Sequence, residues 1–395
     1  MEARLILPLL LLPWTAPAQQ PDLALTLPPA IHAVPGVPLR LFYDNLVLTE
    51  KPEAFRFEFD CPVGTAEQRA WRIEATDDQV GTHPIRVTVR DANGTPLASA
   101  ETRLQVAPRQ AGAGRPLRLL IIGDSLTNAS QYPNEMARWF AEPGNPNVTF
   151  LGTHHPSSAQ PNVSHEGYGG WTWAAFLTRW NPQAAAPAAG PVKRATSPFL
   201  FAREGEPPVF DLPRYFRESC DDQPPDVVTF LLGINDCFSA NPDDPKAIDT
   251  KIDGVLAQAD QLLAAFHAAA PQATLAVGLT TAPNARESGF EANYKGRYHR
   301  WGWKRIQHRL VQRMIDHLAN RESEGIHLVA TELVVDPVEG YPENNGVHPN
   351  AHGYAQIGTA FYSWIKAWCA DADAPPFPQS PPPATAPPDR APARR

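Results

Sequence analysis

The sequence is poor in cysteine and lacks the spacings that bind zinc. Only four cysteines occur in 395 residues, at Cys61, Cys220, Cys237 and Cys369. They form no Cys-X-X-Cys pair and no Cys/His cluster with zinc-ligand spacing. We therefore expect no metal site. An exported chain can oxidise its cysteines, and Cys220 with Cys237 is the pair we would expect to form a disulfide.

Runs of basic residues are also absent, and long apolar runs are missing beyond the N-terminus. The formal net charge is -8. This charge balance and the lack of a Lys/Arg stripe argue against nucleic acid as a partner. The apolar run at residues 5–14 is too short to span a bilayer, which needs about 20 residues. We expect no membrane span in the mature protein.

The N-terminus has the pattern of an export signal. Arg4 precedes the apolar run, and Ala16-Pro17-Ala18 supplies small residues at the spacing of a cleavage site. The pattern predicts a signal peptide over residues 1–18 and a secreted or periplasmic protein. A membrane anchor is the alternative interpretation.

Residues 20–109 have the alternation of an all-β region. Residues 85–90 and 100–106 alternate between apolar and polar side chains, and an Asn-Gly turn at Asn93 and Gly94 lies between them. Residues 55–59 alternate as well. Short strands separated by turns predict a small sandwich of the immunoglobulin-like kind. A packing role and carbohydrate binding are both open for it.

After a linker at residues 111–114, the pattern changes to alternating strands and helices over residues 115–369. Buried parallel strands are expected at residues 117–122, 148–151, 227–232, 274–279 and 326–330, and helices at 248–270, 303–320 and 355–368. This alternation predicts an α/β fold, a parallel sheet with helices on both faces. Residues 182–225 are expected to form a long insertion, either a lid or a substrate loop. Residues 370–395, rich in Pro and Ala, predict a disordered tail.

Four short blocks carry residues suited to chemistry. Gly123-Asp124-Ser125-Leu126 and Gly233-Ile234-Asn235-Asp236 each follow a predicted strand, where open α/β sheets bind ligands. The third block, residues 167–172, is Gly-rich and precedes a predicted helix. It does not have the spacing of a dinucleotide fingerprint, and we expect no cofactor. The fourth is Gly346-Val347-His348-Pro349-Asn350. Each block alone is equally compatible with an ordinary turn or helix cap.

Together the four blocks resemble the SGNH/GDSL hydrolase family, which supplies Ser, Gly, Asn and His in this order. The resemblance implies a flavodoxin-like three-layer α/β/α domain with Ser125 as nucleophile and His348 as general base. It also implies an oxyanion hole made by the backbone N–H groups of Ser125 and Gly170 and the side chain of Asn235. A Ser hydroxyl needs a base that removes its proton, and preorganised donors stabilise the oxyanion that forms.

One position departs from the family pattern. The family usually has Asp three residues before the His, and this chain has Asn345. Three explanations are open: the amide oxygen of Asn345 accepts from the imidazole, a backbone carbonyl does so in a Ser-His dyad, or Glu343 or Asp336 reaches the ring. A degraded site is a fourth.

The substrate expected is an acylated carbohydrate. The block His165-Glu166-Gly167-Tyr168-Gly169-Gly170-Trp171, with an N-terminal β domain, is similar to secreted carbohydrate esterases. Trp171, Trp173 and Trp180 are either stacking surfaces for sugar rings or core residues, the last two sharing one face of a helix. We expect Trp171, Asp124 and Asp236 to bind substrate and polysaccharide O-acetyl groups to be removed. A lipid or thioester hydrolase and a non-catalytic glycan-binding protein are the alternatives.

Overall fold

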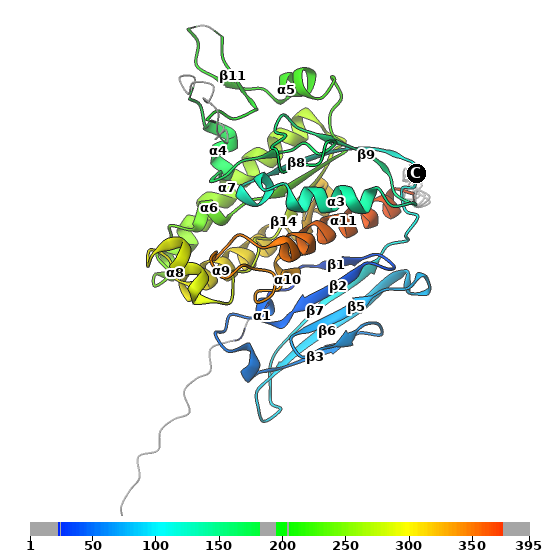
Figure 1. Ribbon diagram of the computed structural model, residues 1–395, viewed down its shortest axis with the longest axis vertical. Coiled ribbons are helices and arrows are strands. Elements are labelled where there is room, and N and C mark those ends of the chain that lie inside the picture. The colour runs from blue at the N-terminus through cyan, green and yellow to red at the C-terminus, as the bar shows by residue number, and fades with distance from the viewer. Residues whose placement is uncertain (1–22, 24, 182–194, 204, 374–395) are drawn as a thin grey trace, which may run out of the picture.

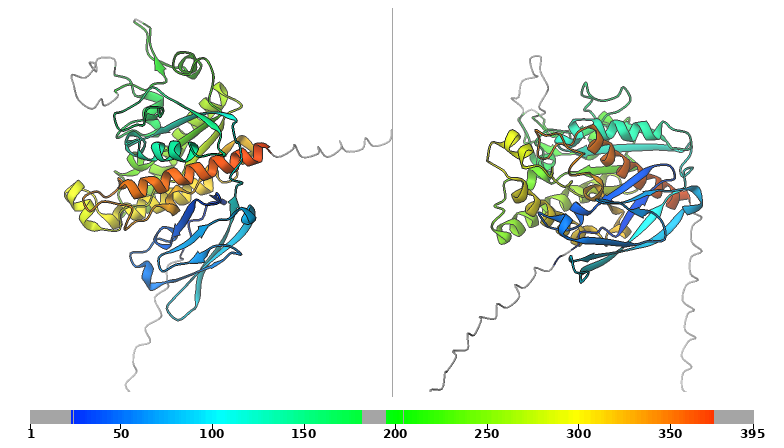
Figure 2. Two further views of the ribbon diagram at one scale, coloured as in Figure 1. Left: turned by 45° about the vertical axis from the view of Figure 1, so that its right-hand side comes forward. Right: turned by 60° about the horizontal axis from the view of Figure 1, so that its bottom comes forward.

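The computed structural model describes residues 23, 25–181, 195–203 and 205–373. The expected signal peptide and most of the expected C-terminal tail lie outside these residues. The N-terminal strands form a layered body that lies beneath a larger α/β body (Figure 1). Figure 2 shows the same two bodies from other sides.

The N-terminal body consists of two small sheets. One has the order β1(Ala30–Ala33), β7(Pro96–Val106), β6(Gly81–Arg90), β3(Arg56–Asp60), and the other β2(Pro38–Phe42), β5(Ala70–Glu74), β4(Thr65–Ala66). A short helix, α1(Tyr43–Leu46), and two 3-10 turns, η1(Pro52–Ala54) and η2(Asp77–Gln79), complete it. The rings of Phe59 and Trp71 stack at 5.7 Å between the two sheets. This contact places the sheets face to face, as in a sandwich.

The expected hairpin is present in this body. Strands β6 and β7 pair antiparallel, and the turn between them contains Gly94 at a positive φ of 88°. Ile85, Val87 and Val89 alternate inward and are almost fully buried. The alternation of apolar and polar residues in the sequence therefore corresponds to a strand with one buried face.

The larger body is built on a parallel sheet. Its order is β9(Asn147–Leu151), β8(Pro116–Gly123), β13(Val227–Leu231), β14(Thr274–Gly278), β15(Ile326–Val329), and β10(Glu166–Gly167) pairs with the carboxyl end of β8 on the same side as β9. Numbered along the sheet this is 2-1-3-4-5, the flavodoxin-like order. The α/β fold class is confirmed, and each predicted strand lies within about two residues of an observed one.

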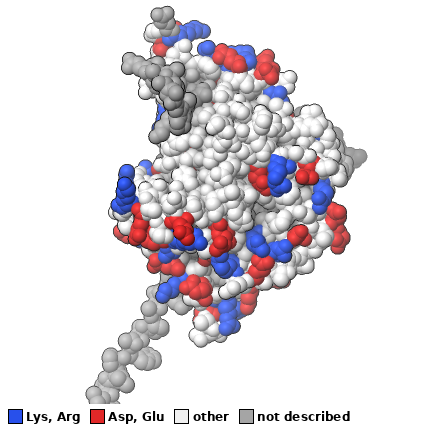
Figure 3. All heavy atoms as spheres, viewed as in Figure 1, with Lys and Arg blue, Asp and Glu red and all other residues white. Residues whose placement is uncertain are grey.

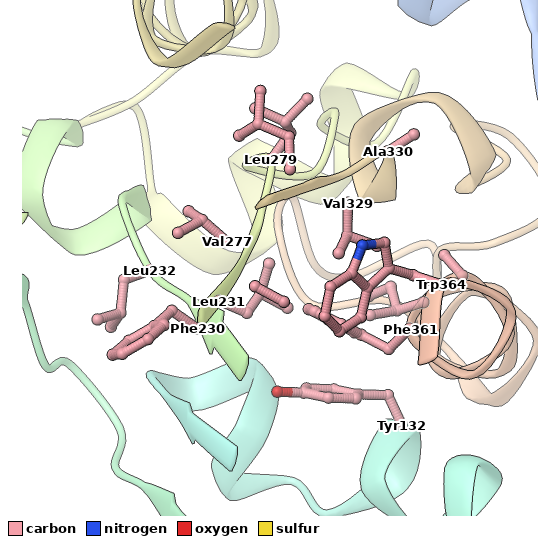
Figure 4. Packing of buried hydrophobic residues seen from close by; sticks show 14 of the residues in the cluster. Tyr132, Phe230, Leu231, Leu232, Val277, Leu279, Val329, Ala330, Phe361 and Trp364 are labelled. Atoms are coloured by element: carbon pink, nitrogen blue, oxygen red, sulfur yellow. The ribbon is translucent and has the colours of Figure 1, made fainter. Parts of the chain in front are cut away.

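Helices cover both faces of the sheet. On one face α3(Gln131–Phe140) packs against α11(Ala351–Asp373), and on the other α4(Trp173–Thr178), α7(Pro245–Ala269) and α9(Arg300–Leu318) pack in sequence (Figures 1 and 2). Short helices follow the strands: α2(Ser125–Asn128), α6(Ile234–Cys237), α8(Glu287–Tyr294) and α10(Thr331–Val334), with η3(Glu322–Glu324) before β15. Figure 4 shows Tyr132 of α3 and Phe361 and Trp364 of α11 packed against β13 and β15.

Three expectations need correction. Helix α11 continues to Asp373, so residues 370–373 are helical and not part of a tail. Cys220 and Cys237 are both free thiols. Cys220 directly follows helix α5(Leu212–Ser219), Cys237 is the last residue of α6, and both are buried. Helix α4 ends at Thr178, so Trp180 lies beyond it and does not share a helix face with Trp173.

The described part of the insertion is anchored in the core. It contains the hairpin β11(Leu200–Phe201)/β12(Val209–Phe210) and helix α5, which project at the top of Figure 1. Phe199 and Tyr215 are fully buried, and Phe199 packs edge-on against Phe266 of α7 at 5.5 Å. These two aromatic side chains hold the segment to the larger body and are not exposed.

Candidate active site

The candidate nucleophile lies where the first strand of the sheet ends. Strand β8 ends at Gly123, and Ser125 is the first residue of α2. Asp124 caps this helix by accepting a hydrogen bond from Leu126 N at 2.9 Å. A Cβ at Gly123 would lie 1.9 Å from the Thr127 hydroxyl oxygen, so only glycine allows so tight a turn. The strand, turn and cap together place Ser125 at the carboxyl edge of the sheet.

The candidate base meets this serine from the far end of the chain. His348 lies in the loop between α10 and α11, and its Nε2 is 2.8 Å from Ser125 Oγ. Burial lowers the pKa of His348 below its ordinary value of 6.5. The imidazole is therefore neutral near neutral pH, the state in which it can accept the serine proton.

Asn345 fixes which nitrogen of the imidazole carries the proton. Its Oδ1 lies 3.1 Å from His348 Nδ1 and also accepts the backbone N–H groups of Val347 at 3.1 Å and His348 at 2.9 Å. Two backbone donors can face only an oxygen, so the amide cannot be turned around. Nδ1 must then donate to Asn345, which leaves the Nε2 lone pair for the Ser125 hydroxyl.

This geometry decides among the explanations for the missing aspartate. Of the four considered, the structure shows the first, in which the Asn345 amide oxygen accepts from the ring. Asp336 is engaged elsewhere, with Arg69 at 3.0 Å and with the N–H groups of Val338 and Glu339. Glu343 is exposed. No carboxylate of the described residues contacts the imidazole.

A buried asparagine supports the loop that carries Asn345 and His348. The Asn284 side chain donates to the carbonyl oxygens of Pro342 and Asn345, both at 2.9 Å, and its backbone N–H donates to Gly346 O at 2.9 Å. Asn284 is fully buried. No motif in the sequence marks this asparagine. Its position after β14, at the same sheet edge, was the only available signal.

The expected oxyanion donors gather near the same edge. Strand β10 pairs with Ile122 and Gly123, and Tyr168 N donates to Gly123 O at 3.1 Å, which holds the Gly-rich loop beside β8. Gly170 in this loop is exposed and has a positive φ of 77°. The Asn235 side chain donates to Trp171 O at 3.0 Å and to Asp124 Oδ2 at 3.3 Å. It thus links the Gly-rich loop to the residue before Ser125.

The three residues expected to bind substrate are buried and engaged with the protein. Trp171 is 1% exposed, Asp124 1% and Asp236 6%. Asp124 caps α2, and Asp236 Oδ1 accepts Trp173 N at 3.0 Å, next to the start of α4. Burial raises the pKa of Asp124 to about 7 and that of Asp236 to about 6. We therefore correct the expectation of direct substrate contact: these side chains shape the turns of the site. Trp173 is likewise a core residue.

The Gly-rich loop is fixed by its preceding residues. Fully buried His165 accepts from Gly167 N at 3.0 Å through Nδ1 and bonds Ser130 Oγ at 2.9 Å through Nε2. Burial lowers the pKa of His165 to about 3, so the ring stays neutral. Buried Glu166 accepts from Thr153 N at 2.7 Å and from the hydroxyls of Tyr168 and Tyr215. These contacts give the block a structural role that its sequence did not reveal.

An aromatic group lies between the Asn235 helix and the His348 loop. Phe238, one residue after α6, contacts Tyr298 at 4.1 Å and Tyr294 at 5.0 Å between ring centroids. Tyr294 and Tyr298 are half-exposed. On the other side, Phe290 of α8 fills the space beside Gly346, where a Cβ would approach its ring to 2.8 Å. The group thus connects both sides of the site and keeps exposed ring surface.

The described residues contain no cluster of His, Cys, Asp and Glu able to hold a metal ion. No helix among them is long and apolar enough to cross a bilayer.

Comparison with known proteins identifies the family. The model of the GDSL-like Lipase/Acylhydrolase family matches residues 121–356, more than half of the chain. The chain therefore belongs to this family of SGNH/GDSL hydrolases, and it is a hydrolase of esters. The resemblance noted from the four sequence blocks is confirmed.

Solved structures of low similarity were also found. A family 3 carbohydrate esterase from Clostridium thermocellum is 17% identical with a TM-score of 0.37, and the match covers 65% of this chain and 100% of that one. A family 3 carbohydrate esterase from Talaromyces cellulolyticus is 16% identical with a TM-score of 0.39, and the match covers 65% of this chain and 99% of that one. A putative arylesterase from Agrobacterium tumefaciens str. C58 is 20% identical with a TM-score of 0.36, and the match covers 63% of this chain and 98% of that one. Similarities this low do not bear on the substrate. Among curated proteins, none matched.

Proposed function

We propose that this hydrolase is an exported serine esterase that removes O-acetyl groups from a polysaccharide, with Ser125, His348 and Asn345 as its catalytic residues. The observation that carries the proposal is the 2.8 Å contact between Ser125 Oγ and His348 Nε2, with Asn345 holding the proton on Nδ1. A neutral base within hydrogen-bond reach of a hydroxyl is the arrangement that activates a serine nucleophile.

In the first half of the reaction, Ser125 Oγ attacks the acetyl carbon while its proton moves to His348 Nε2. The carbonyl oxygen becomes an oxyanion, which the N–H groups of Ser125 and Gly170 would stabilise. The Asn235 amide would join them by giving up its longer bond, 3.3 Å to Asp124 Oδ2. Each such donor is worth on the order of 3 kcal/mol. The C–O bond to the sugar then breaks, and the imidazolium returns the proton to the leaving sugar oxygen. In the second half, His348 Nε2 takes a proton from water while the water oxygen attacks the acyl carbon. The bond between this carbon and Ser125 Oγ then breaks, and the imidazolium returns its proton to Oγ. Acetic acid, which ionises to acetate, and free Ser125 are released.

The carbohydrate part of the proposal has two supports. The N-terminus has an export pattern, which suits an extracellular glycan. The half-exposed rings of Tyr294 and Tyr298 offer surface for sugar rings, with Arg297 over the Tyr298 ring at 5.1 Å. Tyr294 also lies 5.7 Å from Phe290, which packs beside Gly346 of the His348 loop. We assign the stacking role to the two tyrosine rings and not to Trp171 and Trp173, because burial prevents the two tryptophans from contacting a sugar.

The test is release of acetate from an acetylated polysaccharide, together with hydrolysis of p-nitrophenyl acetate and p-nitrophenyl octanoate. Wild type is compared with Ser125→Ala and with the control Ser157→Ala, which changes an exposed serine. We expect acetate release and p-nitrophenyl acetate turnover in wild type and the control, and neither in Ser125→Ala. A strong preference for octanoate would instead indicate a lipid hydrolase. No Ser125-dependent release of acetate from any glycan would contradict the proposal.

A further inference from the structure

A cavity of about 750 Å³ lies between the N-terminal sheets and the hydrolase body. One side comes from α1, η1, the start of β3 and the residues after β4, and the other from the loops after β14 and α10 and from α9. Its volume is within the range of about 300–1,000 Å³ that small-molecule sites occupy. Neither body forms this cavity alone.

The charges that line the cavity balance one another. Four carboxylates and four cationic side chains face it: Asp44, Glu50, Glu53, Glu67, Arg56, Arg69, Arg300 and Lys304. Several are already paired, with Arg69 contacting Asp44 at 3.1 Å and Arg300 contacting Glu50 at 3.4 Å. On the face shown in Figure 3, blue and red side chains are also interspersed over the lower part, where the N-terminal sheets lie. A lining without net charge favours a neutral polar ligand over an anion or a cation.

Lys304 supplies an unused donor in this lining. The residue is 7% exposed, and its Nζ donates to the carbonyl oxygen of Asp44 at 2.8 Å. An ammonium group has three N–H donors, and among the described residues Lys304 uses only this one bond. Burial of a cation whose N–H donors lack acceptors costs free energy of folding, and a further acceptor that bonds these donors lowers this cost. A ligand hydroxyl or ring oxygen would supply that acceptor.

Aromatic surface lies next to these polar groups. Tyr43 and Phe57 stack at 4.8 Å with an interplanar angle of 10°, and Phe55 beside them is half-exposed. Aromatic faces combined with convergent donors and acceptors suit sugars, whose C–H faces are apolar and whose edges carry hydroxyls.

We infer that this cavity binds a neutral segment of the polysaccharide, at a distance along the glycan from the acetyl group that is cleaved. The inference rests on the proposed function in taking the substrate to be a glycan. It gives the N-terminal body a binding role, and it extends substrate recognition across both bodies. Because Asn284 and the residues after α10 also line the cavity, its floor is continuous with the segment that supports the His348 loop.

The test uses the full chain with Ser125→Ala, so that the ligand is not consumed. Binding of xylohexaose and mannohexaose is measured by calorimetry, beside oligogalacturonate as an anionic probe. Ala66→Trp fills the cavity, whereas Thr65→Trp is the matched control, because successive side chains of β4 point to opposite faces and only Ala66 lines the cavity. Phe55→Ala, which removes an aromatic face instead of filling space, is a second variant in case Ala66→Trp unfolds.

We expect a neutral hexaose to bind, with affinity reduced at least tenfold by Ala66→Trp and by Phe55→Ala and unchanged by Thr65→Trp. Unchanged affinity in both cavity variants, binding of oligogalacturonate alone, or no binding of any probe would overturn the inference. The proposed function is judged separately, by acetate release from the protein with Ser125 intact. If acetate is released but the cavity variants leave the affinity for the hexaose unchanged, only the inference is contradicted. If the glycan binds but no acetate is released, only the proposed function is contradicted.

Discussion

The Asn345 side chain bonds the His348 imidazole through an oxygen that two backbone N–H groups hold in place. In serine proteases an Asn in place of the triad Asp costs about 10⁴-fold because it favours the wrong tautomer. Here the tautomer is correct and only the negative charge is missing.

Asn345→Asp should therefore raise activity. The carboxylate would accept the same N–H groups and stabilise the imidazolium that forms in the transition state. We expect kcat/KM for p-nitrophenyl acetate to rise about tenfold at pH 8, and the acid limb of its pH profile to move to higher pH. Asn344→Asp adds the same charge at an exposed neighbouring position and should do neither. Identical pH profiles of kcat/KM for the two variants would show that the Asn345–His348 contact does not contribute to catalysis.

The pH profile of the wild type should extend into the acid range. His348 works as a base only when it is neutral, and burial lowers its pKa from 6.5. The midpoint of the acid limb of kcat/KM should therefore lie below pH 6.5. Asp236 has a pKa raised to about 6 and ionises nearby, so Asp236→Asn, which keeps the acceptor for Trp173 N, serves as the control. A limb above pH 6.5, or one that vanishes in the control, would contradict the assignment to His348.

Asn284→Ala should weaken the loop that positions the base. The change leaves the carbonyl oxygens of Pro342 and Asn345 without their donor inside a buried region, which costs about 2 kcal/mol of unfolding free energy. We expect kcat to fall more than KM rises, because Asn284 acts through His348 and does not touch substrate. Asn241→Ala, at an exposed position, is the control. A stability loss with unchanged kcat would make Asn284 purely structural.

Tyr298→Ala should reduce activity on the polymer more than on the small ester. The ring offers stacking surface to a sugar, and such contacts contribute about 1 kcal/mol each. The ratio of acetate release from acetylated polysaccharide to p-nitrophenyl acetate turnover should fall about fivefold, and Tyr294→Ala should act in the same direction. Trp139→Ala removes a half-exposed ring on α3 and is the matched control. Equal losses on both substrates would exclude a role in glycan recognition.

Glu332 should make stability depend on pH. Both of its carboxyl oxygens are buried and lack a hydrogen-bond partner among the described residues, and burial raises its pKa from 4.5 to about 8. A raised pKa in the folded state means that the folded state retains the proton. Its contribution to stability is thus complete below pH 4.5 and is lost as pH rises towards 8. The gain in Tm of Glu332→Leu over the wild type should be larger at pH 8.5 than at pH 5. Glu343→Gln, at an exposed position, should show no such difference. A pH-independent difference would show that Glu332 is not ionising.

Much of the fold could be predicted because its signals are local. The strand predicted at residues 227–232 is β13, Val227–Leu231, and every one of its residues is buried, which is why it reads as an unbroken apolar run. The four blocks proposed to be catalytic were similarly visible, since each follows a strand or precedes a helix.

What the sequence could not reveal depends on contacts between distant segments. Asn284 supports the His348 loop only because the chain returns 61 residues later to place Asn345 against it. Trp171 has the composition of a sugar-binding residue, yet packing against Tyr168 and Phe176 buries it. The Cys220–Cys237 pairing was wrong because closeness in sequence does not bring the ends of two helices together.

The contact between the two bodies bears on how the protein unfolds. Asn45 of α1 donates to Val335 O at 2.9 Å, Arg69 pairs with Asp336, and the sheet edge at β1 packs on α11. Because these ties reach the segment just before the catalytic loop, melting of the sandwich would release that segment as well. The two bodies should thus unfold together in a single cooperative transition, and the N-terminal sheets stabilise the larger body.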